Sequence, residues 1–180
     1  MTQGAVVWLT GLSGAGKSTL SAEVGRQLAA ADPARRLEVL DGDEIRLYLS
    51  QGLGFTRQDR DTNVHRIAYV ARMLAKHGVL VLAAVISPYA DTRAAIATLS
   101  RDAGHDFVEV FVNAPLSTVA ERDVKGLYKK AMAGEIENFT GVSDPYEPPT
   151  SPAVEVNTDR ESLAESASKI VDALRARGLI

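Results

Sequence analysis

A glycine-rich loop near the start of the chain carries the clearest chemistry in the sequence. "GLSGAGKST", residues 11–19, matches the pattern G-x-x-x-x-G-K-[S/T], follows an apolar run and opens a helical pattern. In that context backbone N–H groups and the positive end of the helix dipole point at phosphates, whereas an isolated glycine-rich turn would merely cap a helix. We therefore predict that the loop binds ATP, with Lys17 bridging the β- and γ-phosphates and the Ser18 hydroxyl ligating Mg²⁺. The predicted nucleotide-binding residues here are Gly11, Ser13, Gly14, Ala15, Gly16, Lys17, Ser18 and Thr19.

Two carboxylates follow the second strand pattern, in "LEVLDGDEIR". Asp41 and Asp43 stand at the carboxyl end of that strand, where doubly wound sheets place their ligands. A kinase needs acids there to hold magnesium and to accept the proton of the attacking hydroxyl. Asp43 also suits the N-cap of a helix that we expect to begin at Glu44, whereas no such structural role is evident for Asp41.

The third strand pattern, "VLVLAAVI", ends in Ser-Pro-Tyr rather than in an aspartate that could help to hold magnesium. Ser87 at this corner either carries a transient phosphoryl group or hydrogen-bonds beside the transferring phosphate, while Pro88 restricts the turn. No base is identifiable next to the serine, so direct transfer to the substrate is the simpler reading.

Side chains suited to a second, anionic substrate cluster downstream. Arg46 and Arg60 can fork onto phosphate or sulfate oxygens, Asn63 can hydrogen-bond them, and Phe55 offers a flat face to a base. Each of these alone is more often a solvated or packing residue, so the prediction depends on the cluster. The basic run Lys125, Lys129 and Lys130 is by default a solvated helix face.

Short β-rich runs alternate with helical patterns, which predicts an α/β fold with a parallel five-stranded sheet and helices on both faces. The irregular run at 134–152, rich in Pro, Gly and acids, is expected to be a mobile flap. We predict one domain over residues 1–180, with a lid over about 122–150. The expected strands are 5–10, 37–40, 79–86, 107–112 and 153–156; the expected helices are 17–31, 44–49, 59–76, 92–102, 116–121 and 160–177.

Composition excludes several other classes of function. A formal charge of −3 provides no general attraction to nucleic acid or an anionic membrane. The chain has no cysteine, which excludes disulfides, thiolate metal sites and cysteine nucleophiles and fits a cytoplasmic location. No signal peptide or membrane span is expected, because the first residues are not basic and no apolar run reaches 18 residues.

Together these motifs resemble the adenylylsulfate kinase (APS kinase) family, which phosphorylates the ribose 3′-hydroxyl of adenosine 5′-phosphosulfate (APS) with MgATP to give 3′-phosphoadenosine 5′-phosphosulfate (PAPS). The resemblance covers nearly the whole chain, in family order and spacing. Its matching stretches are "WLTGLSGAGKST", "LDGDEIR", "LGFTRQDRDTNVHRI", "VISPYA", "ERDVKGLYKKAMAGEIENFTG" and "DPYEPP".

The resemblance implies roles for individual residues. Arg46, Arg60 and Asn63 would hold the phosphosulfate end of the acceptor, and Phe55 and Phe139 would sandwich its adenine. Asp41 and Asp43 would lie near magnesium and the attacking hydroxyl, with Asp41 as the metal ligand and Asp43 as the base. Lys125 would belong to the lid, Arg122 would stack on the adenine of ATP, and Ile86 and Ser87 would shape the acceptor pocket. A homodimer is also implied, with ATP sulfurylase as a candidate functional partner.

Two departures from the family pattern concern the lid and the acceptor corner. Val124 stands where the family usually has proline, and Ala90 where a basic residue often follows "SPY". Two other functions stay open: a P-loop kinase for gluconate or a nucleoside monophosphate, and a nucleotide-gated binding module without catalysis. A GTP switch is disfavoured because "FVNAPLS" lacks the guanine-reading Lys and Asp.

Overall fold

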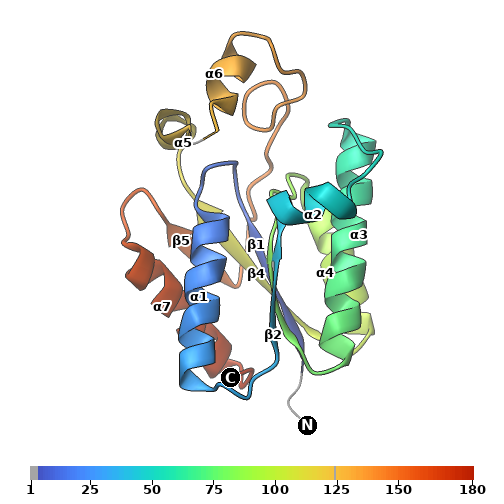
Figure 1. Ribbon diagram of the computed structural model, residues 1–180, viewed down its shortest axis with the longest axis vertical. Helices are drawn as coiled ribbons and strands as arrows, with labels where there is room; N and C mark the ends of the chain where they lie inside the picture. The colour runs from blue at the N-terminus through green and yellow to red at the C-terminus, as the bar shows by residue number, and fades with distance from the viewer. Residues whose placement is uncertain (1–3, 124) are drawn as a thin grey trace.

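Five parallel strands form one sheet in the order β2-β3-β1-β4-β5, which confirms the predicted α/β architecture (Figure 1). The computed structural model describes residues 4–123 and 125–180, so Val124 lies outside the described residues. In chain order the elements are β1 Ala5–Thr10, α1 Lys17–Ala31, β2 Leu37–Asp41, α2 Gly42–Tyr48, α3 Arg57–Lys76, β3 Leu80–Ala84, α4 Ala90–Asp102, β4 Asp106–Asn113, α5 Leu116–Arg122, α6 Leu127–Met132, β5 Val154–Asn157 and α7 Leu163–Ala176.

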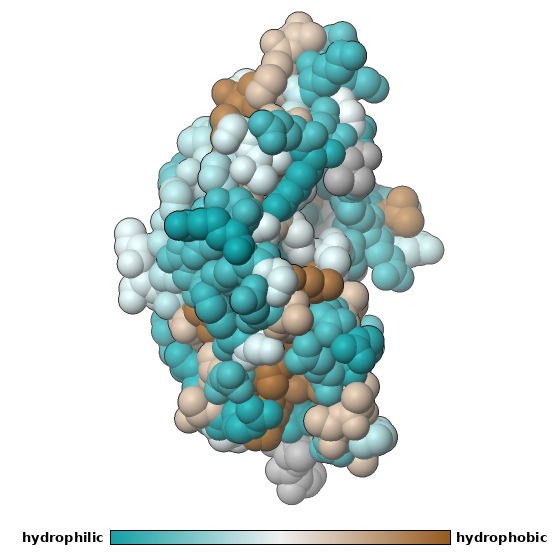
Figure 2. Space-filling view, turned by 90° about the vertical axis from the view of Figure 1, so that its left-hand side faces the viewer, coloured by the Kyte–Doolittle hydropathy of each residue, from teal (hydrophilic) through white to brown (hydrophobic). Residues whose placement is uncertain are grey.

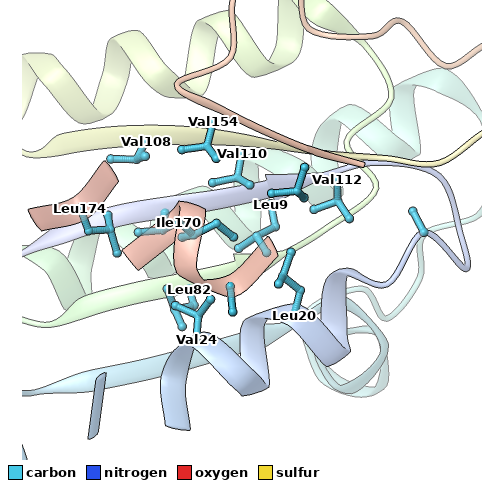
Figure 3. Close-up of a cluster of buried hydrophobic side chains, with 14 of the residues drawn as sticks. Leu9, Leu20, Val24, Leu82, Val108, Val110, Val112, Val154, Ile170 and Leu174 are labelled. Atoms are coloured by element: carbon cyan, nitrogen blue, oxygen red, sulfur yellow. The ribbon is translucent and has the colours of Figure 1, made fainter. Parts of the chain in front are cut away.

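Helices cover both faces of the sheet, as the continuous apolar strand patterns predict. On one face α1 and α7 pack on the sheet through residues such as Leu20, Ile170 and Leu174 (Figure 3). On the other face α2, α3 and α4 pack around Trp8 and Ile67. Every residue of β1 and β3 is buried. Burying one such aliphatic side chain contributes roughly 1.5–3 kcal/mol, so these two layers hold the sheet rigid.

Strand register brings the ends of the strands to one edge. Leu9 of β1 pairs with Ala84 of β3, Asp41 of β2 pairs with the same alanine, and Thr10 pairs with Phe111 of β4. The glycine-rich loop, the two aspartates and the Ser-Pro-Tyr corner all follow these strand ends. They are therefore neighbours although they are far apart in the sequence.

Helices α1 and α5 begin where expected, whereas α2, α3 and α7 begin two or three residues away from the expected start, because capping side chains set their first residues. Helix α2 begins at Gly42 rather than Glu44, with Asp41 as N-cap. Helix α3 begins at Arg57 because Thr56 caps it, and α7 begins at Leu163 because Ser162 and Glu165 form a capping box. The interpretation of Asp43 as an N-cap is therefore wrong.

The segment that we call the lid, residues 123–148, lies beyond the carboxyl edge of the sheet together with α5 (Figure 1). Its described residues, 123 and 125–148, contain the short helix α6 and are otherwise irregular, as predicted for residues 134–152. The carbonyl of Phe139 accepts three turn hydrogen bonds, from the N–H groups of Val142, Ser143 and Asp144. Whether the lid moves stays a prediction.

The surface over α1 and α7 is predominantly hydrophilic, with apolar residues in small separate areas (Figure 2). The polar sides of these amphipathic helices therefore face outward. Among the described residues, none of the helices combines the length and apolar character that a membrane crossing requires.

Gly42 allows the aspartate pair to approach β3 closely, and this contact provides a test of the packing. A Cβ built at Gly42 lies 2.9 Å from the carbonyl oxygen of Ala84, so Gly42→Ala must push α2 away from the strand. We expect a loss of about 1–3 kcal/mol in the free energy of unfolding, measured by urea denaturation.

The matched control is Gly25→Ala. Gly25 also lies in a helix, α1, but a Cβ built there has the Leu37 side chain as its nearest neighbour, at 3.4 Å. Its stability is expected to be unchanged or higher, because alanine favours helix. Equal effects of the two substitutions would contradict the close-packing argument.

Candidate active site

A cavity of about 530 Å³ opens at the carboxyl edge of the sheet, between the glycine-rich loop, α2, α3, the Ser-Pro-Tyr corner and the lid. Most of the predicted site residues line it: Ser13, Gly14, Gly16, Lys17, Ser18, Thr19, Asp43, Arg46, Arg60, Asn63, Ile86, Ser87, Arg122 and Lys125. The remaining ones adjoin or contact a lining residue without lining the cavity themselves: Gly11, Ala15, Asp41, Phe55 and Phe139. The nucleotide-binding and acceptor-binding predictions therefore meet in one cavity.

The glycine-rich loop packs tightly against the end of β4. Gly11 has a φ of 157°, and a Cβ there would lie 2.3 Å from the carbonyl oxygen of Val112. Gly16 has a φ of 101° immediately before α1 begins at Lys17. Glycine at these positions lets the backbone wrap the helix N-terminus, which presents unpaired N–H groups to the cavity.

Lys17 is folded back onto this loop. Its ammonium group donates to the carbonyl oxygens of Gly11 at 3.0 Å and Leu12 at 2.7 Å. Burial lowers the pKa of Lys17 to about 8, against the opposing influence of the Asp43 and Asp41 carboxylates. The lysine is thus a buried cation that lines the cavity, and a bound polyphosphate would favour its charged form.

The two aspartates have different environments. Asp41 accepts a hydrogen bond from the backbone N–H of Asp43 at 2.9 Å, which caps α2. Asp43 points to the cavity, and its carboxylate accepts a hydrogen bond from Lys125 of the lid. The structural role therefore falls on Asp41, the reverse of the expectation from position alone, and Asp43 is the acid with access to a substrate.

The lid is attached to the glycine-rich loop by Tyr128, which sequence reasoning did not identify. Its hydroxyl donates to the carbonyl oxygen of Ser13 at 2.8 Å. Burial raises the pKa of Tyr128 to about 12, so the phenol is a neutral donor. Asp123 caps α6 by accepting from the backbone N–H groups of Tyr128 and Lys129.

The predicted acceptor residues gather around Arg60. Its guanidinium donates to the carbonyl oxygens of Phe55 at 3.1 Å and Asn138 at 2.6 Å, and this joins the loop before α3 to the lid. The guanidinium of Arg46 lies 4.3 Å from the centre of the Phe55 ring. Asn63 accepts a hydrogen bond from Ser50 through its carbonyl oxygen, which leaves its amide N–H groups as donors.

The two aromatic residues predicted to clamp a base lie on the segments that Arg60 joins. Phe55 is half exposed. Phe139 packs edge-on against Tyr128, with ring centres 4.9 Å apart. Neither ring lines the cavity, so their role as a clamp stays a prediction.

Ser87 is held at the corner in a strained conformation. Its φ is 40°, it is only 1% exposed, and its hydroxyl accepts a hydrogen bond from the Trp8 indole at 2.9 Å. Arg122 is held next to the glycine-rich loop, where its guanidinium donates to the Thr158 carbonyl at 2.6 Å. Trp8 and Thr158, like Tyr128, bond across long sequence separations, so no local motif identifies them.

Comparisons with known proteins show which family the chain belongs to. The model of the family "Adenylylsulphate kinase" matches residues 3–157. The adenylyl-sulfate kinase of Myxococcus xanthus is 57% identical over 177 residues, which cover 98% of this chain and 94% of that protein. The corresponding enzyme of Rippkaea orientalis is 54% identical over 178 residues, which cover 99% of this chain and 95% of that protein.

Solved structures with a similar fold lead to the same family. The APS kinase of Mycobacterium tuberculosis, determined in complex with AMPPNP and APS, has a TM-score of 0.92 and 43% identity and covers 97% of this chain and 99% of its own. A gluconokinase of Sinorhizobium meliloti, at 18% identity and a TM-score of 0.62 over 97% of this chain and 93% of its own, shares the fold alone. By both sequence and structure, this chain belongs to the adenylylsulfate kinase family.

Proposed function

We infer that this chain is an adenylylsulfate kinase, which transfers the γ-phosphoryl group of ATP to the 3′-hydroxyl of APS and releases PAPS and ADP. One observation carries the inference: a single cavity joins the glycine-rich loop to the Arg46, Arg60 and Asn63 cluster. Its support is the 57% identity to a curated adenylyl-sulfate kinase along nearly the whole chain.

The phosphate side would work mainly by positioning and charge neutralisation. Lys17 would leave the carbonyl oxygens of Gly11 and Leu12 for the β- and γ-phosphate oxygens. Its ammonium already lies within 3.0 Å of both carbonyls, so the exchange needs only a side-chain rotation. Arg122, held beside Gly14 and Thr158, would stack on the adenine of ATP.

Magnesium fits the donor set of this site. Ser18 and the aspartate pair offer hard oxygen ligands, and the described residues contain no compact cluster of three acidic, His or Cys side chains. Mg²⁺ usually takes one or two protein oxygens and completes its shell with phosphates and water. We propose Ser18 as one ligand and Asp41 as the other, the latter through the carboxylate oxygen that does not cap α2. Bound magnesium would neutralise charge between the phosphates.

The acceptor would lie between the loop before α3 and the lid. Arg46, Arg60 and Asn63 would receive its phosphosulfate group, and Phe55 and Phe139 would enclose its adenine. Arg60 supports this placement because it already ties the segments of both rings together. Ile86 and Ser87 would form the opposite wall of the acceptor pocket.

Asp43 is the proposed general base. The 3′-hydroxyl oxygen would attack the γ-phosphorus, its proton would pass to the Asp43 carboxylate, and ADP would leave. Lys125 contacts this carboxylate across the cavity without substrates. In the loaded complex the lysine would turn to the transferring phosphoryl group, freeing the base while the lid excludes water.

Ser87 is proposed as a positioning residue rather than a phosphoryl carrier. Its hydroxyl is buried and already accepts the Trp8 indole N–H, and neither feature suits a nucleophile. We also propose that the enzyme is a homodimer, acts in the cytoplasm and receives its acceptor from ATP sulfurylase. The family resemblance supports the dimer and the sulfurylase, and the absence of cysteine fits the location.

Acceptor specificity is tested by ADP release from MgATP with APS, gluconate, AMP or adenosine. APS is expected to stimulate release strongly and the other acceptors only weakly, because they lack the phosphosulfate group for the arginines. Stimulation by gluconate or AMP without stimulation by APS would assign another small acceptor. ATP binding without stimulation by any of these acceptors would favour a binding module.

Substitution of the proposed base separates it from the capping aspartate. Asp43→Asn is expected to lower kcat by at least about a hundredfold, because a general base typically contributes that much. Its urea stability should be unchanged, since its carboxylate does not cap α2. Asp41→Ala should cost about 0.5–2 kcal/mol of stability through the lost cap. A near-normal kcat for Asp43→Asn would assign the base elsewhere.

Removal of the corner hydroxyl decides between the two roles of Ser87. Ser87→Ala is expected to keep measurable transfer, with kcat reduced by less than about a hundredfold, because only a hydrogen bond is lost. Rapid-quench assays with γ-labelled ATP should find no phosphoprotein in the wild type. Complete loss of turnover together with a labelled wild-type intermediate would establish the carrier.

A further inference from the structure

Arg93 of α4 lies where three distant segments of the chain meet. It is only 3% exposed, and each of the three nitrogen atoms of its guanidinium donates a hydrogen bond. It donates to the carbonyl oxygens of Ser87 at 2.8 Å and Glu147 at 2.6 Å, and to the Glu109 carboxylate at 2.9 Å. The corner after β3, the strand β4 and the end of the lid are therefore joined by one side chain.

The corner that Arg93 contacts needs such support. Ser87 has a φ of 40°, a strained conformation for a residue other than glycine, which persists only where surrounding contacts enforce it. The Thr10 hydroxyl donates to the Ile86 carbonyl at 2.7 Å, with the Ser87 carbonyl at 3.3 Å, and the Trp8 indole donates to the Ser87 hydroxyl. Strain of this kind, held by buried polar contacts, is common at binding sites.

The end of the lid is bound to the same corner. The backbone N–H of Glu147 donates to the Pro88 carbonyl at 2.9 Å, and the Glu147 carboxylate accepts from the N–H of Ala90 at 2.7 Å. The Tyr146 hydroxyl pairs with that of Thr10 at 3.0 Å. Corner and lid end therefore form one hydrogen-bonded unit with Arg93 at its centre.

We propose that Arg93 is a positioning residue for the acceptor: it holds the Ile86–Pro88 wall of the acceptor pocket and the end of the lid in one arrangement. The proposal rests on the proposed function, because it assigns this wall to the acceptor. Arg93 itself does not line the cavity, so it acts through Ser87 and Glu147. Lysine does not replace it, since an ammonium group lacks the planar fork that serves three acceptors at once.

Trp8 provides a spectroscopic reporter of this unit. It is the only tryptophan in the chain, it is fully buried, and its indole N–H donates to the Ser87 hydroxyl at 2.9 Å. A displaced corner changes this hydrogen bond and hence the fluorescence emission of Trp8. The emission of the protein without ligands therefore reports on the corner independently of catalysis.

The experiment compares Arg93→Lys with Ile170→Val, a control in the core between α7 and the sheet. Arg93→Lys is expected to shift Trp8 emission in the same direction as Ser87→Ala. It should also raise the KM for APS by about tenfold or more while the KM for ATP stays within about twofold, because a displaced wall misplaces only the acceptor. Ile170→Val should lower Tm but leave the emission and both KM values unchanged.

Two results would overturn the proposal. The first is that Arg93→Lys has the same Trp8 emission and the same KM for APS as the wild type. The second is that its KM values for APS and ATP rise equally, which indicates a general loosening of the structure. If Arg93→Lys does not fold, Glu109→Gln replaces it, because this change removes the negative charge that orients the guanidinium. It should give a smaller shift in the same direction, and an unchanged ratio of the two KM values would count against the proposal.

Failure of the proposed function is recognised separately, by wild-type ADP release that APS does not stimulate. The KM comparison is then made with whichever acceptor supports turnover, and the emission comparison stands in any case. An emission shift for Arg93→Lys still supports the positioning role at the corner, and its absence rejects it.

Discussion

Parallel hydrogen bonding of β1 with β3 and β4 is the constraint on which the rest of the structure depends. Since all strands run the same way, all their carboxyl ends lie at one edge, and each end leads into a different functional segment. The buried layers on both faces hold the strands in place, because every residue of β1 and β3 is buried. The core therefore fixes where the cavity lies, and the loops supply the side chains that line it.

The charge of the site is local. The protein has a net formal charge of −3, yet five cationic side chains and three acidic ones line the cavity. Removing a charge from water disfavours its charged form, and Lys17 shows this effect because burial lowers its pKa to about 8. A bound polyphosphate would relieve that penalty by pairing with the ammonium group of Lys17.

Three cationic side chains of the site donate hydrogen bonds to other groups of the protein. Lys17 bonds to the loop carbonyls, Lys125 to Asp43, and Arg60 to the Asn138 carbonyl. The contacts of buried Lys17 and Arg60 are charge-assisted and each has a net worth of about 1.5–3 kcal/mol. The exposed Lys125–Asp43 pair contributes much less, about 0–1 kcal/mol. In the proposed reaction, these contacts would be exchanged for contacts with phosphate and sulfate groups. Tyr128 and Lys125 connect the lid to the glycine-rich loop and to Asp43.

The sequence by itself determined the sheet, the phosphate loop and the residues that gather at the cavity, because these depend on local patterns: apolar runs, a nine-residue motif and short motifs after strands. The tertiary structure decided which aspartate caps α2, since that depends on where the helix begins, two residues earlier than the pattern indicates. It also decided the partners of Arg93, which contacts residues 87, 109 and 147. No local pattern relates those positions. They meet only because the strands β3 and β4 and the end of the lid converge on one buried guanidinium that requires three acceptors.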